Sequence, residues 1–335
     1  QWALRAALTT VAVIALGSVA LVLLWRDRPS LDAIDWAPYP SVDATAGAVR
    51  VTWLGVATLL FDDGETQLLI DGFISRPTLA DVVLDRPVKS DAARINYVMD
   101  KYGMRRLAAI IPVHAHYDHA MDAGAIANRS SASILGSETM ANIARGAGVP
   151  EDQIVVVEDG SQFTFGQFTV TLFHSPHAPI GWGGSVPYDG TVDEPLETPA
   201  PVSAWRVGQG YSVVIAHPHG TTVVQGSAGF GEKALADVQA DVVMLGVQLL
   251  EGLGRNYAEQ YWQALVTATG AHHVILIHFD DFTLPFGEIE AAPHSAAALT
   301  LYALVSTLEF ERAGYLFKLA KLADLSASQR QLAYR

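Results

Sequence analysis

The chain has 335 residues, of which 50% are hydrophobic and 17% are charged, so it can bury a substantial core and is not globally disordered. Its formal net charge of −14 argues against a nucleic-acid partner, because phosphate binding requires a basic surface. The chain contains no cysteine, which excludes thiolate metal ligands and disulfide bonds.

The first predicted element is a membrane anchor. Residues 6–25 carry no charged side chain and are flanked by Arg5 and Arg26. A run of about 20 apolar residues is long enough to cross a bilayer, and this one lacks the small residues of a signal-peptide cleavage site. We therefore predict a transmembrane helix within residues 1–28, inserted through residues 6–25. The alternative is a buried core helix. Export of the following domain is the usual outcome for such an anchor, which predicts a single-pass protein with a periplasmic domain.

A linker and a β-hairpin follow the anchor. Residues 29–48 are rich in proline and aspartate, which predicts an extended linker. Strands are predicted over Thr52–Phe61 and Gln67–Ile70, with a turn at residues 62–64. A helix is predicted over Ser90–Tyr102.

The next stretch carries the strongest chemical signal in the chain. The apolar run Leu107–Val113 predicts a buried strand, and His114, His116, Asp118 and His119 follow it directly. A helical pattern begins after these residues, so the four polar side chains lie at a strand-to-helix turn, a common position for a site. Imidazole and carboxylate groups suit zinc or a similar ion. The alternative, a helix-capping turn, accounts for Asp118 alone and leaves the histidines unexplained.

Strands and helices alternate after this motif. Strands are predicted over Ser133–Leu135, Ile154–Val157 and Phe163–Phe173, and a helix over Glu138–Arg145. Two histidines near the end of the last strand are candidate ligands. We favour His177, because it lies in the loop beyond the strand, over His174, because a histidine that ends a strand is often a structural group.

A long loop rich in glycine and proline occupies residues 181–201, and loops of this length are often lids or binding loops. Trp182 and Tyr188 are its candidates for substrate contact, with an ordinary surface loop as the equal alternative. His217 and His219 lie in a Pro-Gly turn and are predicted to be structural.

The remaining predicted elements lead to a last histidine. The predicted strands are Ser203–Val207, Ser212–Ala216, Thr221–Val224, Val242–Leu245 and His273–Ile277, and the predicted helices are Tyr257–Thr269 and Ser295–Leu308. His278 follows the last strand, with Asp280 and Asp281 close behind it. We predict that residues 325–335 are a tail.

These motifs resemble the metallo-β-lactamase fold superfamily. Residues 114–119 match its H-x-H-x-D-H signature at every fixed position. Residues 51–58 and 69–72 look like the N-terminal hairpin of the branch that holds the L-ascorbate phosphate lactonases and the N-acyl-phosphatidylethanolamine phospholipase D enzymes. Further similar segments occur in the same order over about residues 49–320. They are residues 175–177, 223–229 and 275–278.

The resemblance implies an α/β fold, an αβ/βα sandwich of two sheets flanked by helices, over residues 49–324. It also implies metal ligands: His114, His116 and His177 for a first ion, and Asp118, His119 and His278 for a second. By analogy, Asp118 and His119 take part in catalysis, and Asp71 supports the metal ligands. The implied activity is metal-dependent hydrolysis of a phosphodiester, a lactone or another ester, in a small-molecule or lipid-derived substrate.

Two positions depart from the family pattern. Val56 replaces a histidine, and Ser227 stands where an aspartate normally bridges two ions. A serine hydroxyl is a weak, neutral ligand, so we predict one zinc per chain rather than two, unless Asp280 or Asp281 compensates.

These departures also motivate a different hypothesis, in which the domain is a catalytically degenerate subunit or binding module of a membrane assembly. An oxidoreductase with a di-iron site is the third hypothesis, and it is the least compatible with Ser227.

Overall fold

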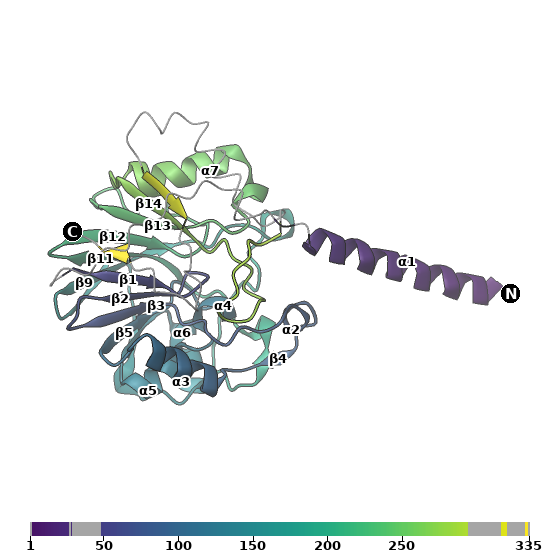
Figure 1. Ribbon diagram of the computed structural model, residues 1–335, viewed down its shortest axis with the longest axis horizontal. Helices are drawn as coiled ribbons and strands as arrows, with labels where there is room; N and C mark the ends of the chain where they lie inside the picture. The colour runs from purple at the N-terminus through teal and green to yellow at the C-terminus, as the bar shows by residue number, and fades with distance from the viewer. Residues whose placement is uncertain (1, 27, 29–47, 294–315, 320–331, 334–335) are drawn as a thin grey trace.

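The computed structural model describes residues 2–26, 28, 48–293, 316–319 and 332–333. Its centre consists of two seven-stranded sheets with helices on their outer sides, α3 and α5 on one side and α7 on the other (Figure 1). This is the α/β sandwich predicted from the sequence. The described helices are α1 (Trp2–Arg26), α2 (Leu79–Val83), α3 (Ala92–Lys101), α4 (Tyr117–Ala120), α5 (Ala123–Ser130), α6 (Glu138–Gly146) and α7 (Arg255–Trp262).

The first sheet has the strand order β16-β1-β2-β3-β5-β6-β7. Its strands β3, β5, β6 and β7 run parallel to one another, whereas β16, β1 and β2 pair antiparallel. The strands are β1 (Arg50–Trp53), β2 (Leu59–Asp62), β3 (Gln67–Ile70), β5 (Leu107–Ile111), β6 (Ser133–Gly136), β7 (Ile154–Val156) and β16 (Leu332–Ala333).

The second sheet has the strand order β15-β14-β13-β12-β11-β9-β8, parallel from β15 to β12 and antiparallel from β12 to β8. A short ribbon joins β4 (Pro87–Val88) to β10 (Ala200–Pro201). The strands of the second sheet are β8 (Ser161–Phe165), β9 (Phe168–Ser175), β11 (Gly210–His217), β12 (Gly220–Gln225), β13 (Val242–Gly246), β14 (His273–Ile277) and β15 (Leu316–Leu319).

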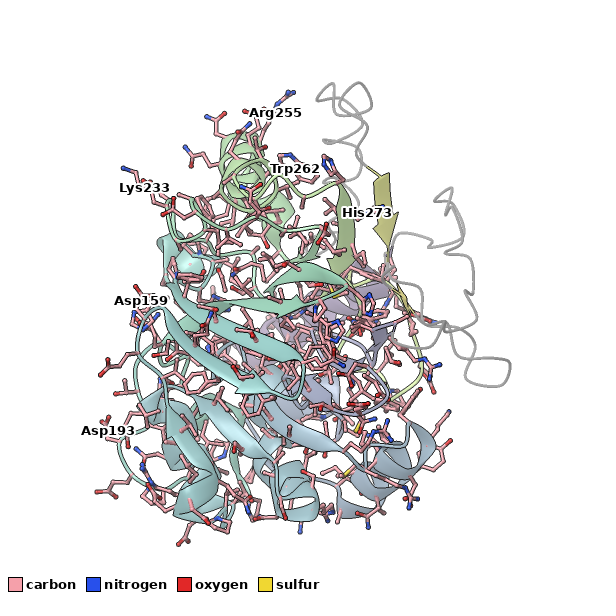
Figure 2. All side chains as sticks on the ribbon, turned by 90° about the vertical axis from the view of Figure 1, so that its left-hand side faces the viewer. Asp159, Asp193, Lys233, Arg255, Trp262 and His273 are labelled. Atoms are coloured by element: carbon pink, nitrogen blue, oxygen red, sulfur yellow. The ribbon has the colours of Figure 1, made fainter. Side chains whose placement is uncertain are left out.

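Alternating side chains of the first sheet enter two different cores. Phe61 and Ile111 face the second sheet and belong to the core between the sheets, whereas Leu60 and Ile110 face the helices. Successive side chains of a strand point to opposite faces, so a strand buried on both sides reads as a continuous apolar run. Trp262 of α7 is buried, whereas charged side chains such as Lys233 and Arg255 project from the surface (Figure 2).

Three predicted strands differ from the observed ones. The stretch Thr52–Phe61 forms two strands, because Gly55 and Val56 adopt positive φ angles of 96° and 54° and turn the chain. The stretch Phe163–Phe173 also divides, at Gly166, whose φ is 58°. Residues 203–207 form no strand. Residues 203 and 204 belong to a 3-10 turn at Val202–Ala204, and residues 205–207 follow it.

The structure also differs from the prediction at both ends of the domain. The predicted tail contributes β16, which pairs with β1. Arg28, placed in the predicted anchor, lies 2.6 Å from the Asp281 carboxylate of the domain. The predicted helix Ser295–Leu308 and most of the predicted linker lie outside the described residues.

The predicted anchor segment forms α1, a helix of 25 residues that extends away from the sheets (Figure 1). Apolar side chains along it are exposed, including those of Val11 and Leu16. Within the part of the chain that the structure describes, no helix has the length and apolar character of a membrane span. The structure therefore does not support the predicted transmembrane helix.

Candidate metal centre

Five strand ends bring the candidate residues together at one edge of the sandwich. Asp71 follows β3, residues 114–119 follow β5, His177 follows β9, and His278 follows β14. The turn after β12 lies against two of the neighbouring loops. A Cβ atom on Gly226 would meet Val113 at 2.4 Å, and one on Gly229 would meet the Pro176 carbonyl oxygen at 1.9 Å. Glycine at these two positions therefore lets the loops that carry the histidines approach one another.

The histidines and Asp118 form two clusters, and within each cluster one ligand atom from each residue lies within 4.8 Å of the others. The first cluster contains His114, His116 and His177, and the second contains Asp118, His119 and His278. These are the two sets that the sequence predicted. His174 belongs to neither. It is exposed on β9, and the centre of its ring lies 5.5 Å from that of Tyr211, at a tilted angle.

In the first cluster, three imidazole rings converge. His114 Nε2 lies 3.0 Å from His116 Nδ1, and the ring of His177 lies 4.8 Å and 4.9 Å from the rings of His114 and His116. The second nitrogen of His116 lies 2.9 Å from the Pro187 carbonyl oxygen, and His177 Nδ1 lies 2.8 Å from the Ala178 carbonyl oxygen. Metal-binding histidines commonly place their other nitrogen on a protein oxygen, which fixes the tautomer.

These three histidines are neutral near pH 7. Burial lowers the pKa of His116 to about 3 and that of His177 to about 4, and it lowers the pKa of His114 well below its usual value. Neighbouring imidazoles lower the pKa of each one further, because they disfavour another positive charge. A neutral imidazole is the form that coordinates a metal, so the first cluster fits a divalent ion.

In the second cluster, Asp118 lies between two histidines. Its Oδ2 atom is 3.6 Å from His119 Nε2 and 3.5 Å from His278 Nε2. Burial by itself would raise the pKa of Asp118, but His119 and His278 lower it below its usual value, so this carboxyl group is ionised. His278 Nδ1 is buried and has no hydrogen-bond partner within the described structure.

Asp71, which the family resemblance predicts to support the metal ligands, contacts residues at both clusters. It is fully buried, and its Oδ2 atom lies 2.7 Å from His119 Nδ1. Its Oδ1 atom accepts a 2.8 Å hydrogen bond from the Val113 N–H, just before His114. The single carboxylate therefore positions ligands of both clusters.

Backbone strain gathers around the same loops. Val56, Asp71 and His278 have φ angles of 54°, 58° and 54°, in the left-handed region that non-glycine residues rarely adopt. Each such residue costs of order 1–3 kcal/mol and persists where its surroundings fix it. The Val56 carbonyl accepts a 2.8 Å hydrogen bond from the His278 N–H, so two of the strained residues hold each other.

Comparison with known proteins agrees with this geometry. No protein-family model matches the chain. A UPF0173 metal-dependent hydrolase from Heliobacterium modesticaldum is 29% identical over 123 residues, which is 37% of this chain and 44% of that protein. The chain spans about half the length of the curated relatives that it matches.

Two solved structures are similar to most of the chain. CmlA, a diiron β-hydroxylase from Streptomyces venezuelae, has a TM-score of 0.52 and 14% identity, over 88% of this chain and 55% of that chain. The metallo-β-lactamase fold protein YhfI from Bacillus subtilis has a TM-score of 0.49 and 16% identity, over 86% of this chain and 99% of that chain. The chain is similar in fold to CmlA, with two sheets flanked by helices. Its sequence relatives are metal-dependent hydrolases.

The position that the family resemblance predicts to bridge two ions carries no charge. The hydroxyl of Ser227 accepts a 3.3 Å hydrogen bond from the Gly229 N–H. The sequence left open that Asp280 or Asp281 compensates, but both turn away from the clusters. Asp280 accepts hydrogen bonds from the Val56 N–H at 2.9 Å and 3.1 Å, and Asp281 accepts from Thr283 and pairs with Arg28. Asp118 is therefore the one carboxylate of the two clusters.

Val56, the other departure from the family pattern, does not alter the wall of the site. Its side chain is fully buried in the core between the first sheet and the helices. Its backbone anchors the loop that follows β14, through Asp280 and His278. Asp280 also pairs with the buried guanidinium of Arg76 at 3.7 Å. The sequence gave no sign of this ion pair, because its two residues are far apart in the chain.

A cavity of about 220 Å³ opens onto both clusters. Tyr188 lines it, whereas Trp182, the other candidate from the long loop, is 99% exposed and does not. The sequence did not single out several of the remaining lining residues. They are Val82, Tyr117, Ala178, Ile180, Pro187, Ala228, Gln248, Leu249 and Phe282.

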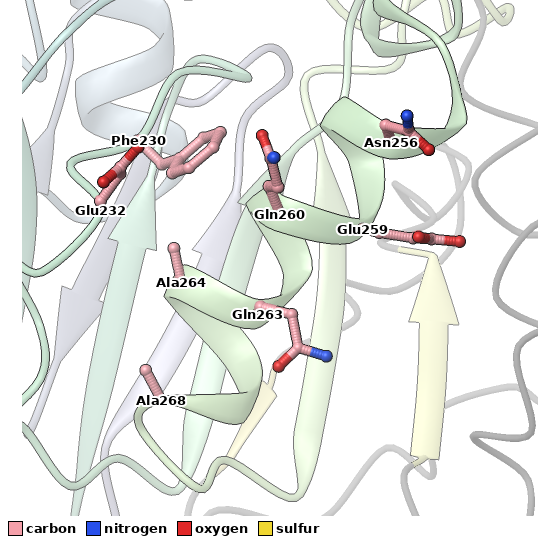
Figure 3. Close-up of a pocket in the computed structure, with 8 residues that line it drawn as sticks. All are labelled: Phe230, Glu232, Asn256, Glu259, Gln260, Gln263, Ala264 and Ala268. Carbon is pink, nitrogen blue, oxygen red and sulfur yellow. The ribbon is translucent and has the colours of Figure 1, made fainter.

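A larger hollow of about 810 Å³ lies elsewhere, on the outer side of α7 and the π-helical turn η6 (Gln263–Thr267) (Figure 3). Phe230, Glu232 and Gln260 are among its lining residues. The described lining of this hollow contains no residue of either cluster. We therefore assign the site to the cavity of about 220 Å³, although the hollow is larger.

Proposed function

We propose that the protein is a metal-dependent hydrolase that uses one divalent ion, bound by His114, His116 and His177. The observation that carries this proposal is the convergence of three neutral imidazoles beside an ionised carboxylate, at the wall of one cavity. The similarity to metal-dependent hydrolases supports it. Zinc suits three histidine ligands, because three-histidine sites leave a coordination position open for water or substrate.

A divalent ion at this site supplies Lewis acidity, which lowers the pKa of water to about 7 and polarises a carbonyl group. Asp118 is ionised and lines the cavity, so it can orient the attacking water and accept its proton. The water oxygen forms a bond to the carbonyl carbon, and the bond from that carbon to the leaving alkoxide breaks. The proton held by Asp118 then passes to the alkoxide.

His119 and His278 are the other two residues of the second cluster, and they lie beside Asp118. Both place Nε2 within 3.6 Å of its Oδ2 atom. The Asp71 and Asp118 carboxylates outweigh burial and raise the pKa of His119. A protonated His119 donates hydrogen bonds, so it can stabilise negative charge that develops on the substrate.

The test of this proposal is hydrolysis of a 4-nitrophenyl ester by the zinc-loaded protein. We expect His116→Ala to lose activity and zinc together. His174→Ala is the matched control, because this histidine is exposed and outside both clusters. Equal rates in the wild type and His116→Ala would reject the hydrolase proposal. They would favour the catalytically degenerate binding module, for which the uncharged Ser227 is the structural argument.

The location and partners of the protein are a separate proposal. We propose that α1 attaches the protein to a membrane or to a membrane-protein partner, and its exposed apolar side chains support this. The periplasmic location of the domain stays a prediction from the sequence. We expect removal of residues 1–27 to release a folded domain, because Arg28 stays and keeps its contact with Asp281. Membrane fractionation after a high-salt wash tests this. A truncated protein that still sediments with membranes would contradict it.

A further inference from the structure

We infer that the cavity selects a small, uncharged substrate with an apolar acyl group, and that Tyr188 and Phe282 determine this selectivity. The inference rests on the proposed hydrolase function and narrows its substrate class. The sequence left phosphodiesters, lactones and other esters as equal candidates. The chemistry of the cavity wall favours the uncharged carbonyl compounds over the phosphodiesters.

The first argument is the charge of the wall. Among the described lining residues there is no lysine or arginine. Apart from the two clusters and the tyrosine hydroxyls, the polar side chains of the wall are those of Ser227 and Gln248, and both are neutral. A buried anionic group without a cationic partner is costly, so phosphate and carboxylate substituents are disfavoured away from the metal.

Arg76 is a buried cation near the cavity, and it already has protein partners. Arg76 pairs with Asp280 at 3.7 Å, donates a 3.1 Å hydrogen bond to the Leu54 carbonyl oxygen, and lies 4.8 Å from the centre of the Phe73 ring. It is not a lining residue of the cavity. Arg76 therefore cannot serve as a phosphate ligand without breaking contacts that hold the loop after His278.

The second argument is the arrangement of the aromatic rings. The Tyr188 ring lies 6.0 Å from that of His116, beside the first cluster, and the Phe282 ring lies 6.2 Å from that of His278, beside the second. Tyr117 lies between them, 6.4 Å from Tyr188 and 6.1 Å from Phe282. Three aromatic rings thus form a continuous apolar wall along both clusters, which suits an acyl chain.

The third argument is size. The cavity of about 220 Å³ is smaller than the roughly 300–1,000 Å³ of sites that enclose drug-sized ligands. An acyl chain of a few carbons fits this space. The long chains of a lipid do not, so the cavity favours a small substrate over the lipid-derived substrate that the sequence suggested.

The experiment compares two probes with the same leaving group, 4-nitrophenyl butyrate and ethyl 4-nitrophenyl phosphate, on the zinc-loaded protein. Each kcat/KM is divided by the uncatalysed rate constant of the probe. We expect this normalised kcat/KM to be at least tenfold higher for 4-nitrophenyl butyrate than for ethyl 4-nitrophenyl phosphate. We also expect butyrate to be favoured over acetate by about tenfold, because each buried methylene contributes about 0.8 kcal/mol.

Variants of the wall test the assignment to particular residues. Gln248→Arg adds a cation and is expected to reduce the preference for the uncharged probe at least fivefold. Gln248→Met, of similar size and neutral, is its control. Tyr188→Ala and Phe282→Ala are each expected to reduce the butyrate-to-acetate ratio to less than threefold, mainly through a higher KM for butyrate.

The possible outcomes separate this inference from the hydrolase proposal. A preference for the phosphodiester would overturn the inference while the hydrolase proposal stands. The same holds if the wall variants change neither the ester-to-phosphodiester ratio nor the butyrate-to-acetate ratio. If neither probe is hydrolysed faster than by His116→Ala, the hydrolase proposal fails. Ligand-observed NMR then decides the inference by comparing binding of butyramide and succinamate to the zinc-loaded protein. Tighter binding of butyramide would support it, and equal or tighter binding of succinamate would overturn it.

Discussion

The clearest test of the candidate metal centre is Ser227→Asp, which introduces a carboxylate at the position that bridges two ions in related sites. Two-metal sites hold their ions about 3.5–4 Å apart. Two unit charges at that distance interact by about 4 kcal/mol at an effective dielectric constant of ~20, so two divalent ions repel by roughly 16 kcal/mol. The two clusters oppose this repulsion with one formal negative charge, that of Asp118. We therefore expect the unmodified protein to bind about one zinc per chain.

A carboxylate at position 227 changes this balance. At ~4 Å from each ion it would offset roughly 8 kcal/mol of repulsion per ion, before the cost of its own desolvation. We expect the second ion to bind at least 100-fold more tightly in Ser227→Asp and the metal content to rise towards two. Ser227→Asn, of the same size and neutral, should stay near one. Mass-spectrometric metal counting on protein purified without chelator measures this. Two tightly bound ions in the unmodified protein, or an equal gain in Ser227→Asn, would refute the reasoning.

Three further predictions concern the loops that hold the ligands. Asp71→Asn should weaken zinc binding by about 10–100-fold, measured by chelator competition, because a neutral amide is a weaker acceptor for the Val113 N–H that precedes the ligand His114. His177→Ala should lose zinc while His174→Ala keeps it, and the opposite result would reverse the assignment of the third ligand. Gly229→Ala should lower the free energy of unfolding by roughly 1–3 kcal/mol and reduce zinc content, because the added Cβ would meet the Pro176 carbonyl oxygen. Unchanged stability and zinc content in Gly229→Ala would show that the turn does not position His177.

The family resemblance and the local pattern of the sequence were together sufficient to predict which residues gather in the two clusters. The apolar run that forms β5 ends directly before His114, and the run that forms β14 has the predicted bounds His273–Ile277. Because the ends of these strands meet at one edge of the fold, residues that follow them become neighbours. His177 could be favoured over His174 for the same reason, since a residue past the strand end can turn towards the site.

Features that depend on contacts between distant segments could not be predicted. The turn at Gly55 and Val56 interrupts an apolar stretch that reads as one strand, and a Cβ on Gly55 would meet the Arg76 guanidinium at 2.1 Å. That arginine is buried there by its pairing with Asp280, which follows β14. Neither residue shows its partner in the local sequence, so periodicity alone cannot locate the turn.

The wall of the cavity was equally hidden. The sequence singled out Tyr188 as a candidate for substrate contact, but nothing marked Gln248 and Phe282, which come from other loops, as its neighbours. Pro187 contributes a carbonyl oxygen to His116, which sequence motifs cannot reveal because every residue has that group. Side-chain chemistry pointed to the candidate metal ligands, whereas most of the cavity wall became visible only in the fold.

The uncharged Ser227 and the uncharged cavity wall bear on the same question, although they are independent observations. A phosphodiester carries a negative charge before the reaction and spreads more over its oxygens in the transition state, so its hydrolysis benefits from a second ion or from cationic side chains. A carbonyl substrate begins neutral and develops one negative charge, which one divalent ion together with His119 can stabilise. The loss of the bridging carboxylate removes the means of holding a second ion, and the wall supplies no described arginine or lysine in its place. A site with this charge balance matches the neutral carbonyl substrate.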